Sequence, residues 1–415
     1  MTGHENETTG STKLDTHQDE RVPETAGCPY AHDAGRIGPL PDFLEHGDEP
    51  VTRIATPTGH KMWLVRDYAL GRSVLTDRRF SRAEAVKPHA PTVIDAQPVP
   101  DSMMSMDGAE HARLRRMVTG SFTTGKVAAM TPFVERLADE HLDRLAEAGP
   151  GADLVGTIAA PLPLEVLCSL LGVPPEDAGR FRDWVEVLFD ISVSNPREKA
   201  RRRLELVEYM STLIEEKRQR GEDDLLTSLI GAHDDGDLSM PELLTLGLTL
   251  LMAGYETTVG QLSLSVLALL SDPTALAALR ERPELVPTAV EELMRLSPAT
   301  PLAFPRVAVE PVELGDITVQ PGEGVLVSLL HGNRDGAVFT DPERIDADGR
   351  TAAHLTFGHG VHRCLGAPLA RLQVRITVER LLRRFPGLRT ASGPDAVIWK
   401  DGLATRGLSR LRVEW

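Results

Sequence analysis

The sequence predicts a mainly α-helical protein with small peripheral β-sheets, and two observations support this class. Four long segments carry apolar residues at three- and four-residue spacing, which is the periodicity of a helix with a buried face; they are 134–148, 197–220, 241–270 and 286–296. The strand-like segments, in contrast, are short and confined to 51–64 and 311–330. This pattern favours one large domain over two layered ones.

The first 33 residues are expected to form a disordered acidic tail. They carry seven acidic and two basic residues among many Thr, Gly and Asn residues, with little to bury. No linker-like stretch or internal repeat follows. Residues 34–415 are therefore expected to form a single domain.

The two strand-like regions contain their own turn signals. Pro57 and Gly59 separate the segments 51–54 and 61–64, which predicts a hairpin. In the second region, Gly315 and Pro321–Gly322 divide 311–330 into short strands.

The segment 241–270 predicts a buried helix that crosses the whole domain. Ser239 and Glu242 have the spacing of a capping box, Pro241 lies in the first turn, and Pro273 follows the last one. About 31 residues at 1.5 Å each span roughly 46 Å. Because the helix is apolar on nearly every side, it should be surrounded by protein.

Small and polar residues interrupt this helix at 253–258, which reads Ala-Gly-Tyr-Glu-Thr-Thr. A glycine inside a helix costs about 1 kcal/mol relative to alanine, and a buried carboxylate such as that of Glu256 needs a partner. Two interpretations are open from the residues alone. The interruption is either a packing notch, with Glu256 reaching a partner, or a groove that serves a function.

Charge and composition exclude several classes of protein. The 415 residues include 61 acidic and 45 basic side chains, a net charge of -16, which argues against nucleic acid as a partner. Three cysteines cannot build a disulfide scaffold and fit a reducing compartment. The longest apolar run, 243–255, is shorter than the roughly 20 residues that span a bilayer. We therefore expect a cytoplasmic protein without a membrane partner.

The segment 357–366, Phe-Gly-His-Gly-Val-His-Arg-Cys-Leu-Gly, carries the most specific chemistry. Its glycines allow a tight loop that can approach a flat ligand closely. Cys364 precedes an amphipathic helix predicted at 367–385, whose first amide groups, with Arg363, should lower the pKa of the thiol. A lone cysteine is more often a small buried apolar residue, but this glycine framework with two histidines is unusual.

This segment resembles the haem-binding loop of cytochromes P450, in which Phe, Gly, Cys and Gly recur at the spacing of Phe357, Gly360, Cys364 and Gly366. Further motifs match in family order over roughly residues 40–415, and they resemble the bacterial, actinomycete-type branch. The resemblance implies the cytochrome P450 fold, with haem b between the long central helix and the cysteine loop. It makes Cys364 the iron ligand.

The resemblance also implies the residues that hold the cofactor. His111 and Arg115, one helical turn apart, match the family's clamp for the haem propionates, and Arg306 and His362 complete the set. Further contacts are expected from Met104, Ala253, Gly254, Phe357, Gly358, Leu365 and Gly366. A buried ion network that supports the loop is implied for Glu292, Arg295 and Arg344.

The interrupted helix resembles the family's oxygen-binding groove, where a break in the helical hydrogen bonds leaves room for O2 and water. Glu256 would relay protons and Thr257 would hydrogen-bond oxygen at the haem. Tyr255 is bulkier than usual for its position and is expected to face away from the haem. O2 is the implied cosubstrate.

The resemblance implies a monooxygenase that hydroxylates or epoxidises a mostly apolar small molecule, in secondary-metabolite biosynthesis. An alternative is oxidative coupling, which forms C–C or C–N bonds between aromatic substrates, such as cyclic dipeptides or polyketides, without oxygen insertion. A haem-binding sensor or carrier is a third reading, but it would not need the Glu256–Thr257 pair. The substrate pocket is expected to include Val86, Val93, Phe189, Leu302, Ala303 and Ala404.

The electron donors implied are a ferredoxin and a ferredoxin reductase. Between Val361 and Arg389 the chain has seven arginines and one glutamate, a local charge of +6. Arg113 and Arg116 lie beside His111 on the same predicted helix. We expect these arginines to form a docking surface for an acidic ferredoxin, although a helix face solvated in the ordinary way would carry the same charges.

Overall fold

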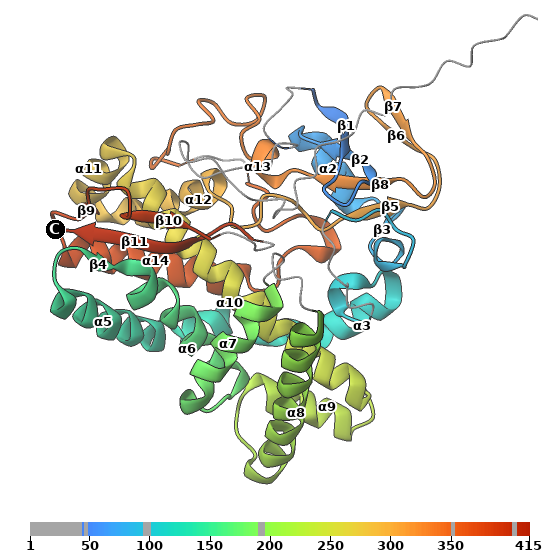
Figure 1. Cartoon of the computed structure of the whole chain (residues 1–415), viewed down its shortest axis with the longest axis horizontal. Coiled ribbons are helices and arrows are strands. Elements are labelled where there is room, and N and C mark those ends of the chain that lie inside the picture. Colours follow the sequence, from blue (N-terminus) through green and yellow to red (C-terminus); the bar gives the residue numbers. More distant parts are fainter. Residues whose placement is uncertain (1–43, 45–48, 94–100, 190–195, 350–352, 401–404) are drawn as a thin grey trace, which may run out of the picture.

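The computed structural model confirms the mainly α-helical class with small sheets (Figure 1). It describes residue 44 and residues 49–93, 101–189, 196–349, 353–400 and 405–415, so the predicted tail at 1–33 lies outside the described residues. The helices are α2 (Tyr68–Thr76), α3 (Gly108–Thr119), α4 (Thr124–Ala129), α5 (Thr131–Ala148), α6 (Pro161–Leu171), α7 (Ala178–Phe189), α8 (Pro196–Arg220), α9 (Leu225–Asp234), α10 (Met240–Leu270), α11 (Pro273–Glu281), α12 (Val286–Leu296), α13 (Leu329–Gly332) and α14 (Ala367–Arg384).

The largest sheet joins strands from both halves of the chain in the order β1-β2-β8-β5-β3. Its strands are β1 (Val51–Ala55), β2 (Lys61–Val65), β3 (Phe80–Ser81), β5 (Arg306–Ala308) and β8 (Gly324–Val327). The predicted hairpin is the antiparallel β1–β2 pair, and β2 runs parallel to β8 with Met62 opposite Gly324. The sheet therefore ties residues about 260 positions apart in sequence.

Two smaller sheets account for the other strands. The hairpin predicted around Gly315 is formed by β6 (Val312–Leu314) and β7 (Ile317–Val319). Near the C-terminus, β10 (Val397–Trp399) and β11 (Leu408–Glu414) form a second hairpin, to which β4 (Ala152–Asp153) and β9 (Arg389–Thr390) add. Sequence patterns did not predict this C-terminal sheet.

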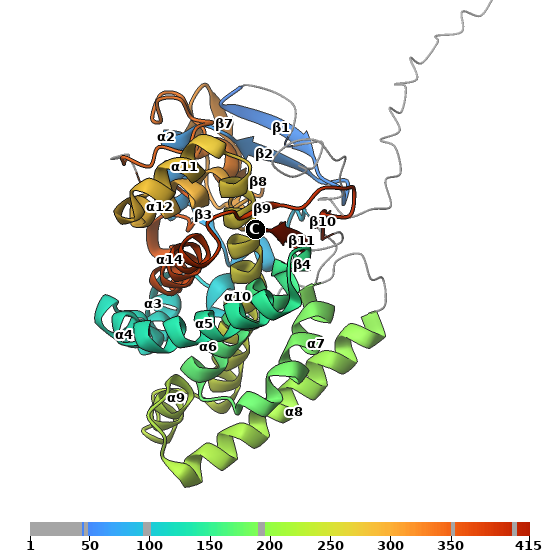
Figure 2. The same ribbon diagram turned by 90° about the vertical axis from the view of Figure 1, so that its left-hand side faces the viewer.

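Helix α10 is the centre of the molecule, as its apolar sequence predicts. Its capping box is present, because the Ser239 hydroxyl accepts from the Glu242 amide and the Glu242 carboxylate accepts from the Ser239 amide. Figures 1 and 2 show α10 in the middle of the molecule, with α8 and α9 near one end and α11, which follows it in the chain, at the other. By length and composition α10 could span a membrane, but 61% of its most apolar stretch is buried within the protein.

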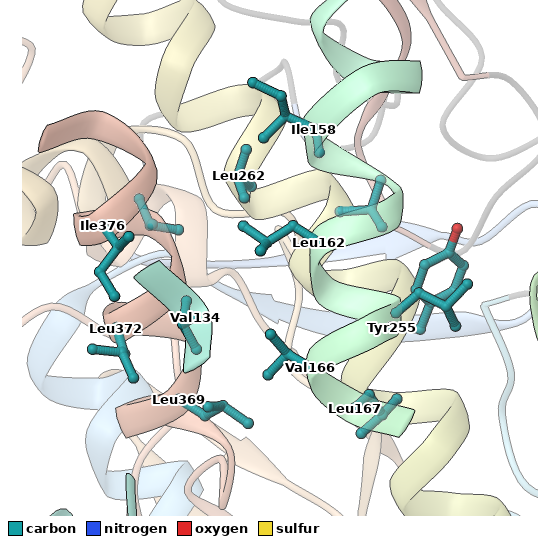
Figure 3. Packing of buried hydrophobic residues seen from close by; sticks show 14 of the residues in the cluster. Val134, Ile158, Leu162, Val166, Leu167, Tyr255, Leu262, Leu369, Leu372 and Ile376 are labelled. Carbon is teal, nitrogen blue, oxygen red and sulfur yellow. The ribbon is translucent and has the colours of Figure 1, made fainter. Parts of the chain in front are cut away.

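The main hydrophobic core lies where α6 and α14 pack against α10, and α5 packs against both α6 and α14. Figure 3 shows side chains from these helices in this core, among them Leu162 and Val166 of α6, Leu262 of α10 and Leu372 of α14. Full burial of one such side chain stabilises a fold by about 1.5–3 kcal/mol. Tyr255 of α10 is only 1% exposed and belongs to this core.

Candidate functional site

The segment 357–366, called the cysteine loop below, bends tightly before α14. Gly360 has a φ of +74°, which L side chains rarely adopt, and a Cβ there would lie 2.5 Å from the Leu75 carbonyl oxygen of α2. The Cys364 amide donates to the Phe357 carbonyl over 2.8 Å and closes the loop. Since α14 begins at Ala367, the predicted position of Cys364 just before a helix is confirmed.

The Cys364 side chain is accessible, yet the surrounding protein raises the pKa of its thiol by burial. The amides of Gly366 and Ala367, together with the guanidinium groups of Arg115 and Arg363, lower that pKa, but by less. The prediction of a net lowering is therefore wrong, because desolvation outweighs these groups. A thiol in such surroundings becomes a thiolate when it coordinates a metal ion, which removes the proton outright.

The four cations predicted to clamp the propionates come together beside the cysteine loop. The imidazole centroids of His111 and His362 lie 4.2 Å apart, so α3 and the loop meet at these two rings. The Arg115 guanidinium donates to the Arg363 carbonyl over 2.5 Å. Arg306, from β5, is buried and its charge acts on His362.

Electrostatics within this group reflect burial and mutual repulsion. Burial, followed by repulsion from His362 and Arg115, lowers the pKa of His111 to about 4. Burial lowers the pKa of Arg306 to about 10. The buried Nε2 of His362 makes no hydrogen bond with the part of the chain that the structure describes. Buried guanidinium groups beside an imidazole nitrogen without a hydrogen bond favour the binding of an anion.

Sequence reasoning missed two members of this group, Arg82 and Asp107. The Arg82 guanidinium donates to the Met104 carbonyl over 3.0 Å and to the Pro305 carbonyl, and burial lowers the pKa of Arg82 to about 9. Asp107 accepts from the Ser81 hydroxyl and the Arg82 amide at 2.6 and 2.9 Å. No local signal marks Arg82, because its burial depends on loops that meet only in the folded chain.

We call Arg82, His111, Arg115, Arg306 and His362 the cation cluster, after its three guanidinium groups, because the lowered pKa of His111 leaves that imidazole neutral at pH 7. Asp107, the carboxylate beside it, lies 3.5 Å from the His362 Nε2, so the arginine charges exceed the nearby negative charge. Two propionate carboxylates would balance them, and each charge-assisted hydrogen bond is worth about 1.5–3 kcal/mol. The residues present therefore fit haem b.

The side chains and backbone of the other predicted cofactor contacts are partly accessible. All seven are half-buried, although they come from α10, the turn 103–105 and the cysteine loop: Met104, Ala253, Gly254, Phe357, Gly358, Leu365 and Gly366. In the middle of α10, Met252 and Thr257 are likewise half-buried, whereas the following turns are buried. This part of α10 is therefore less completely covered by protein than the turns that follow it. The assignment of these residues to haem remains a prediction.

The predicted break in α10 is not observed, because the helix is continuous from Met240 to Leu270. The Thr257 hydroxyl donates to the Ala253 carbonyl over 2.6 Å, and the Thr258 hydroxyl donates to the Gly254 carbonyl over 2.8 Å. Each hydroxyl bonds a backbone carbonyl that already accepts a hydrogen bond within the helix. Threonine bonds of this kind usually bend a helix and do not break it. Part of the packing interpretation is correct, since a Cβ at Gly254 would lie 3.0 Å from the Leu167 side chain.

Glu256 does not point the same way as Thr257. Its side chain is buried, and Oε1 accepts from the Lys400 ammonium over 2.7 Å. Lys400 follows β10 in the C-terminal sheet. Sequence reasoning expected a partner for this carboxylate but could not identify one 144 residues away.

The Glu292–Arg295 pair forms the predicted buried ion pair, with two hydrogen bonds of 2.8 and 2.9 Å. Arg344 differs from the prediction, because its side chain is 73% exposed and 3.8 Å from Asp341. It joins the network through its backbone, where the carbonyl accepts from Arg295 over 2.9 Å. A carbonyl serves as well as a charge here because Glu292 already balances the guanidinium.

The predicted substrate-pocket residues are only partly described. Val93 and Leu302 are buried in one small apolar cluster, Val86 is half-buried, and the Ala303 amide donates to the Val327 carbonyl. The Phe189 side chain and Ala404 lie outside the described residues. Their assignment to a pocket remains a prediction.

The arginine-rich segment 361–389 is less electropositive than its sequence suggests, because most of its arginines pair with acids. Their N–O distances are 2.6–3.2 Å, and the pairs are Arg371–Glu291, Arg375–Glu379, Arg380–Asp139, Arg384–Asp143 and Arg389–Glu414. Arg113 likewise binds Glu110 and Glu242. Exposed Arg72, Arg116 and Arg363 form no ion pair with the described residues. Arg363 lies in the cysteine loop, Arg72 donates to His359 of that loop, and Arg116 follows Arg115 on α3.

Comparison with known sequences agrees with this geometry. Residues 184–394 match the family model described as Cytochrome P450. The chain is 42% identical to nocardicin C N-oxygenase from Nocardia uniformis subsp. tsuyamanensis, over 89% of this chain and 93% of the relative. It is 41% identical to mycinamicin IV hydroxylase/epoxidase from Micromonospora griseorubida, over 92% and 95%.

Solved structures are similar over the same extent. The cytochrome P450 hydroxylase of the leinamycin pathway from Streptomyces atroolivaceus superposes with a TM-score of 0.84 and 40% identity, covering 93% of this chain and 99% of that one. A cytochrome P450 with biaryl coupling reactivity has a TM-score of 0.82 and 33% identity, covering 94% and 98%.

Proposed function

The chain belongs to the cytochrome P450 family, and on this premise we propose that it hydroxylates or epoxidises a mostly apolar small molecule in secondary-metabolite biosynthesis. One observation carries the proposal: an accessible cysteine on a tight loop lies beside a largely buried cation cluster, whose three guanidinium charges exceed the charge of the neighbouring Asp107. Relatives named for hydroxylation, epoxidation and N-oxygenation support the reaction class.

Haem b is held by residues with separate tasks. Cys364 ligates the iron, and the cation cluster holds the propionates, with Arg82 added to the four predicted residues. When bound, haem b supplies reductive activation of O2, which a thiolate ligand favours throughout this family. The protein positions one bond of the substrate and keeps water away from it.

Glu256 and Thr257 supply protons to the reaction. A carboxylate can accept a proton from water and release it inward, and a hydroxyl can hand it on. Thr257 is half-buried, while Glu256 is buried and its carboxylate accepts from Lys400. The acid must therefore move, or pass its proton through water, to reach Thr257.

The absorption spectrum of the reduced carbonyl complex tests the cofactor assignment. We expect a strongly red-shifted Soret band that is lost in Cys364→Ser. Cys168→Ser is the matched control, because Cys168 is buried in α6 and burial raises its pKa to about 12. A band that survives in Cys364→Ser, or that is absent from the unaltered protein, would contradict the assignment. Turnover with a surrogate redox chain and a substrate library then tests the reaction.

Oxidative coupling is the second candidate, favoured by the 33% identical structure with biaryl coupling reactivity. Labelled O2 separates the two reactions, because hydroxylation or epoxidation places the label in the product and coupling does not. In both cases the substrate is expected to be neutral or weakly polar. Tight binding of polyanions alone, in a spin-state titration, would exclude this substrate class.

For the electron donor we propose an acidic ferredoxin, reduced by a ferredoxin reductase, in the cytoplasm. The docking surface is redefined as Val361, which is 61% exposed, with the exposed Arg72, Arg116 and Arg363. An apolar centre with a charged rim is the usual anatomy of a protein interface. Steering by these charges should weaken as salt rises.

Charge reversal tests this surface. Arg72→Glu and Arg116→Glu should each slow reduction by ferredoxin at low salt and flatten its salt dependence. Arg384→Glu is the control, because Arg384 pairs with Asp143 and lies outside the defined surface. Equal slowing by all three variants, or a rate independent of ionic strength, would contradict docking at Val361.

A further inference from the structure

The ion pair between Glu256 and Lys400 joins the centre of α10 to the C-terminal hairpin. Lys400 Nζ donates to Glu256 Oε1 over 2.7 Å, and the two side chains are 18% and 1% exposed. Lys400 therefore reaches the edge of the protein, whereas Glu256 does not. The ammonium therefore links this buried carboxylate to a more exposed part of the protein.

The position of Lys400 is fixed by close backbone packing. A Cβ at Gly260, one turn after Glu256, would collide with the Arg406 carbonyl oxygen, and a Cβ at Gly407 would lie 3.2 Å from the Gly260 Cα. The Lys400 amide also donates to the Gly407 carbonyl over 3.0 Å. The hairpin thus rests on α10 in one register, which brings the ammonium to Glu256.

Two further described residues lie close to the pair. Arg406, also in the hairpin, donates to the Pro298 carbonyl and lies over the Trp399 ring at 5.9 Å. The charge of Arg334 acts on Arg406. Tyr255, next to Glu256, packs into the main core.

We propose that Lys400 is a positioning residue for the proton path. Its ammonium keeps Glu256 ionised and holds Oε1 on the hairpin side of α10, where water can protonate it. The carboxylate takes one proton from water, becomes a carboxylic acid, passes a proton inward and returns to the carboxylate, and Lys400 takes no part in the transfer. This inference rests on the proposed function, since it deepens the role of Glu256.

Three variants separate a positioning role of Lys400 from a purely structural role, in which it only holds the hairpin against α10. Lys400→Met keeps the length of the side chain without its charge, and Lys400→Arg keeps the charge. Ser409→Ala is the matched control, because its hydroxyl bonds only within the hairpin among the contacts described, to the Ile398 and Trp399 carbonyls.

Infrared spectroscopy tests the charge state without turnover. A buried carboxylate that loses its counter-charge takes up a proton. Lys400→Met should therefore show a new band of a protonated carboxylic acid at neutral pH, and a second substitution, Glu256→Gln, should remove it. The unaltered protein, Lys400→Arg and Ser409→Ala should lack the band. Its absence in Lys400→Met would overturn the proposal.

Turnover tests the consequence. Lys400→Met should lower kcat about tenfold with KM unchanged, a modest share of the effect typical of an acid–base group, and should raise the solvent deuterium isotope effect. Lys400→Arg should restore both. If Lys400→Met and Ser409→Ala slow turnover equally, with unchanged isotope effects, the role of Lys400 is purely structural and the proposal is wrong. Failure of the proposed function would differ, because the unaltered protein would then lack the red-shifted Soret band.

Discussion

Arg295 shows why some buried positions accept a single residue type. Its guanidinium makes five hydrogen bonds, two to Glu292 and one each to the carbonyls of Asn333, Pro342 and Arg344. Five donors in a planar fork are the full capacity of arginine. The Asn333 side chain in turn bonds Thr356, one residue before the cysteine loop. The network therefore sets the position of that loop.

Substitution of Arg295 should be severely destabilising. Arg295→Met leaves the Glu292 carboxylate buried without its partner, and we expect a loss of about 3–5 kcal/mol in the free energy of unfolding, measured with urea. Arg344→Ala should change it by less than about 0.5 kcal/mol, because the backbone carbonyl remains. Similar losses in both variants would show that the Arg344 side chain matters after all.

The contribution of Glu291 to the free energy of unfolding should depend on pH. Burial would raise the pKa of its carboxyl, but His354 and Arg371 outweigh burial and lower that pKa to about 2, below the unfolded value of about 4.3. Its contribution is therefore fully present above about pH 5 and is lost as the pH falls towards 2. After allowance for its exposure, Glu291→Gln should cost about 1 kcal/mol at pH 7 and progressively less as the pH falls from about 4 through about 2, by urea unfolding. A constant difference would contradict this.

At the residue scale, local spacing could identify Cys364 and the His111–Arg115 turn, because each motif is contiguous. Lys400 and Arg82 could not be found in this way. Their partners lie on segments that meet them only after folding, and neither a lysine after a short strand nor an arginine before a loop is unusual in sequence.

Among the elements, the contact between α10 and the C-terminal hairpin depends on the absence of a side chain at Gly260. Gly260→Ala should separate the hairpin from α10 and destabilise the protein by about 1–3 kcal/mol, measured by thermal unfolding. Gly231→Ala in α9 is the control, because a Cβ there meets nothing within 4 Å and should stabilise by about 0.5–1 kcal/mol. Equal effects would argue against close packing at Gly260.

Helix ends were predictable where their signals are local. The capping box and Pro241 mark the start of α10, and the predicted 286–296 coincides with α12. The continuity of α10 through 253–258 was not predictable, because surrounding helices stabilise it despite a glycine and two threonines. The pairing of β4 with β11 likewise joins short segments that have no periodicity of their own.

For the whole molecule, the net charge of -16 does not show that many arginines are paired with acidic residues. Arginines of α14 face acids of α5 at 2.6 Å in two pairs, Arg380–Asp139 and Arg384–Asp143. The packing of α14 on α5 therefore aligns opposite charges as well as apolar side chains. The charge left for a partner is therefore smaller than a count along the sequence indicates.

We propose that residues 34–415 fold as one unit and that residues 1–33 add nothing to its stability. Deleting 1–33 removes seven acidic and two basic residues, which changes the net charge from -16 to -11. The melting temperature, by calorimetry, should then shift by less than about 1 °C, since few apolar groups are lost. A fall of several degrees would show that the segment packs on the domain.

The parallel pairing of β2 with β8 also bears on how the chain is made. During synthesis, residues 61–65 leave the ribosome some 260 residues before their partners at 324–327. At about 5–20 residues per second, the β1–β2 hairpin waits at least ten seconds with an open edge. An open edge is a template for unwanted strand pairing. Slow translation or scarce chaperones should therefore reduce the yield of this protein through aggregation of nascent chains, before any defect in the finished fold.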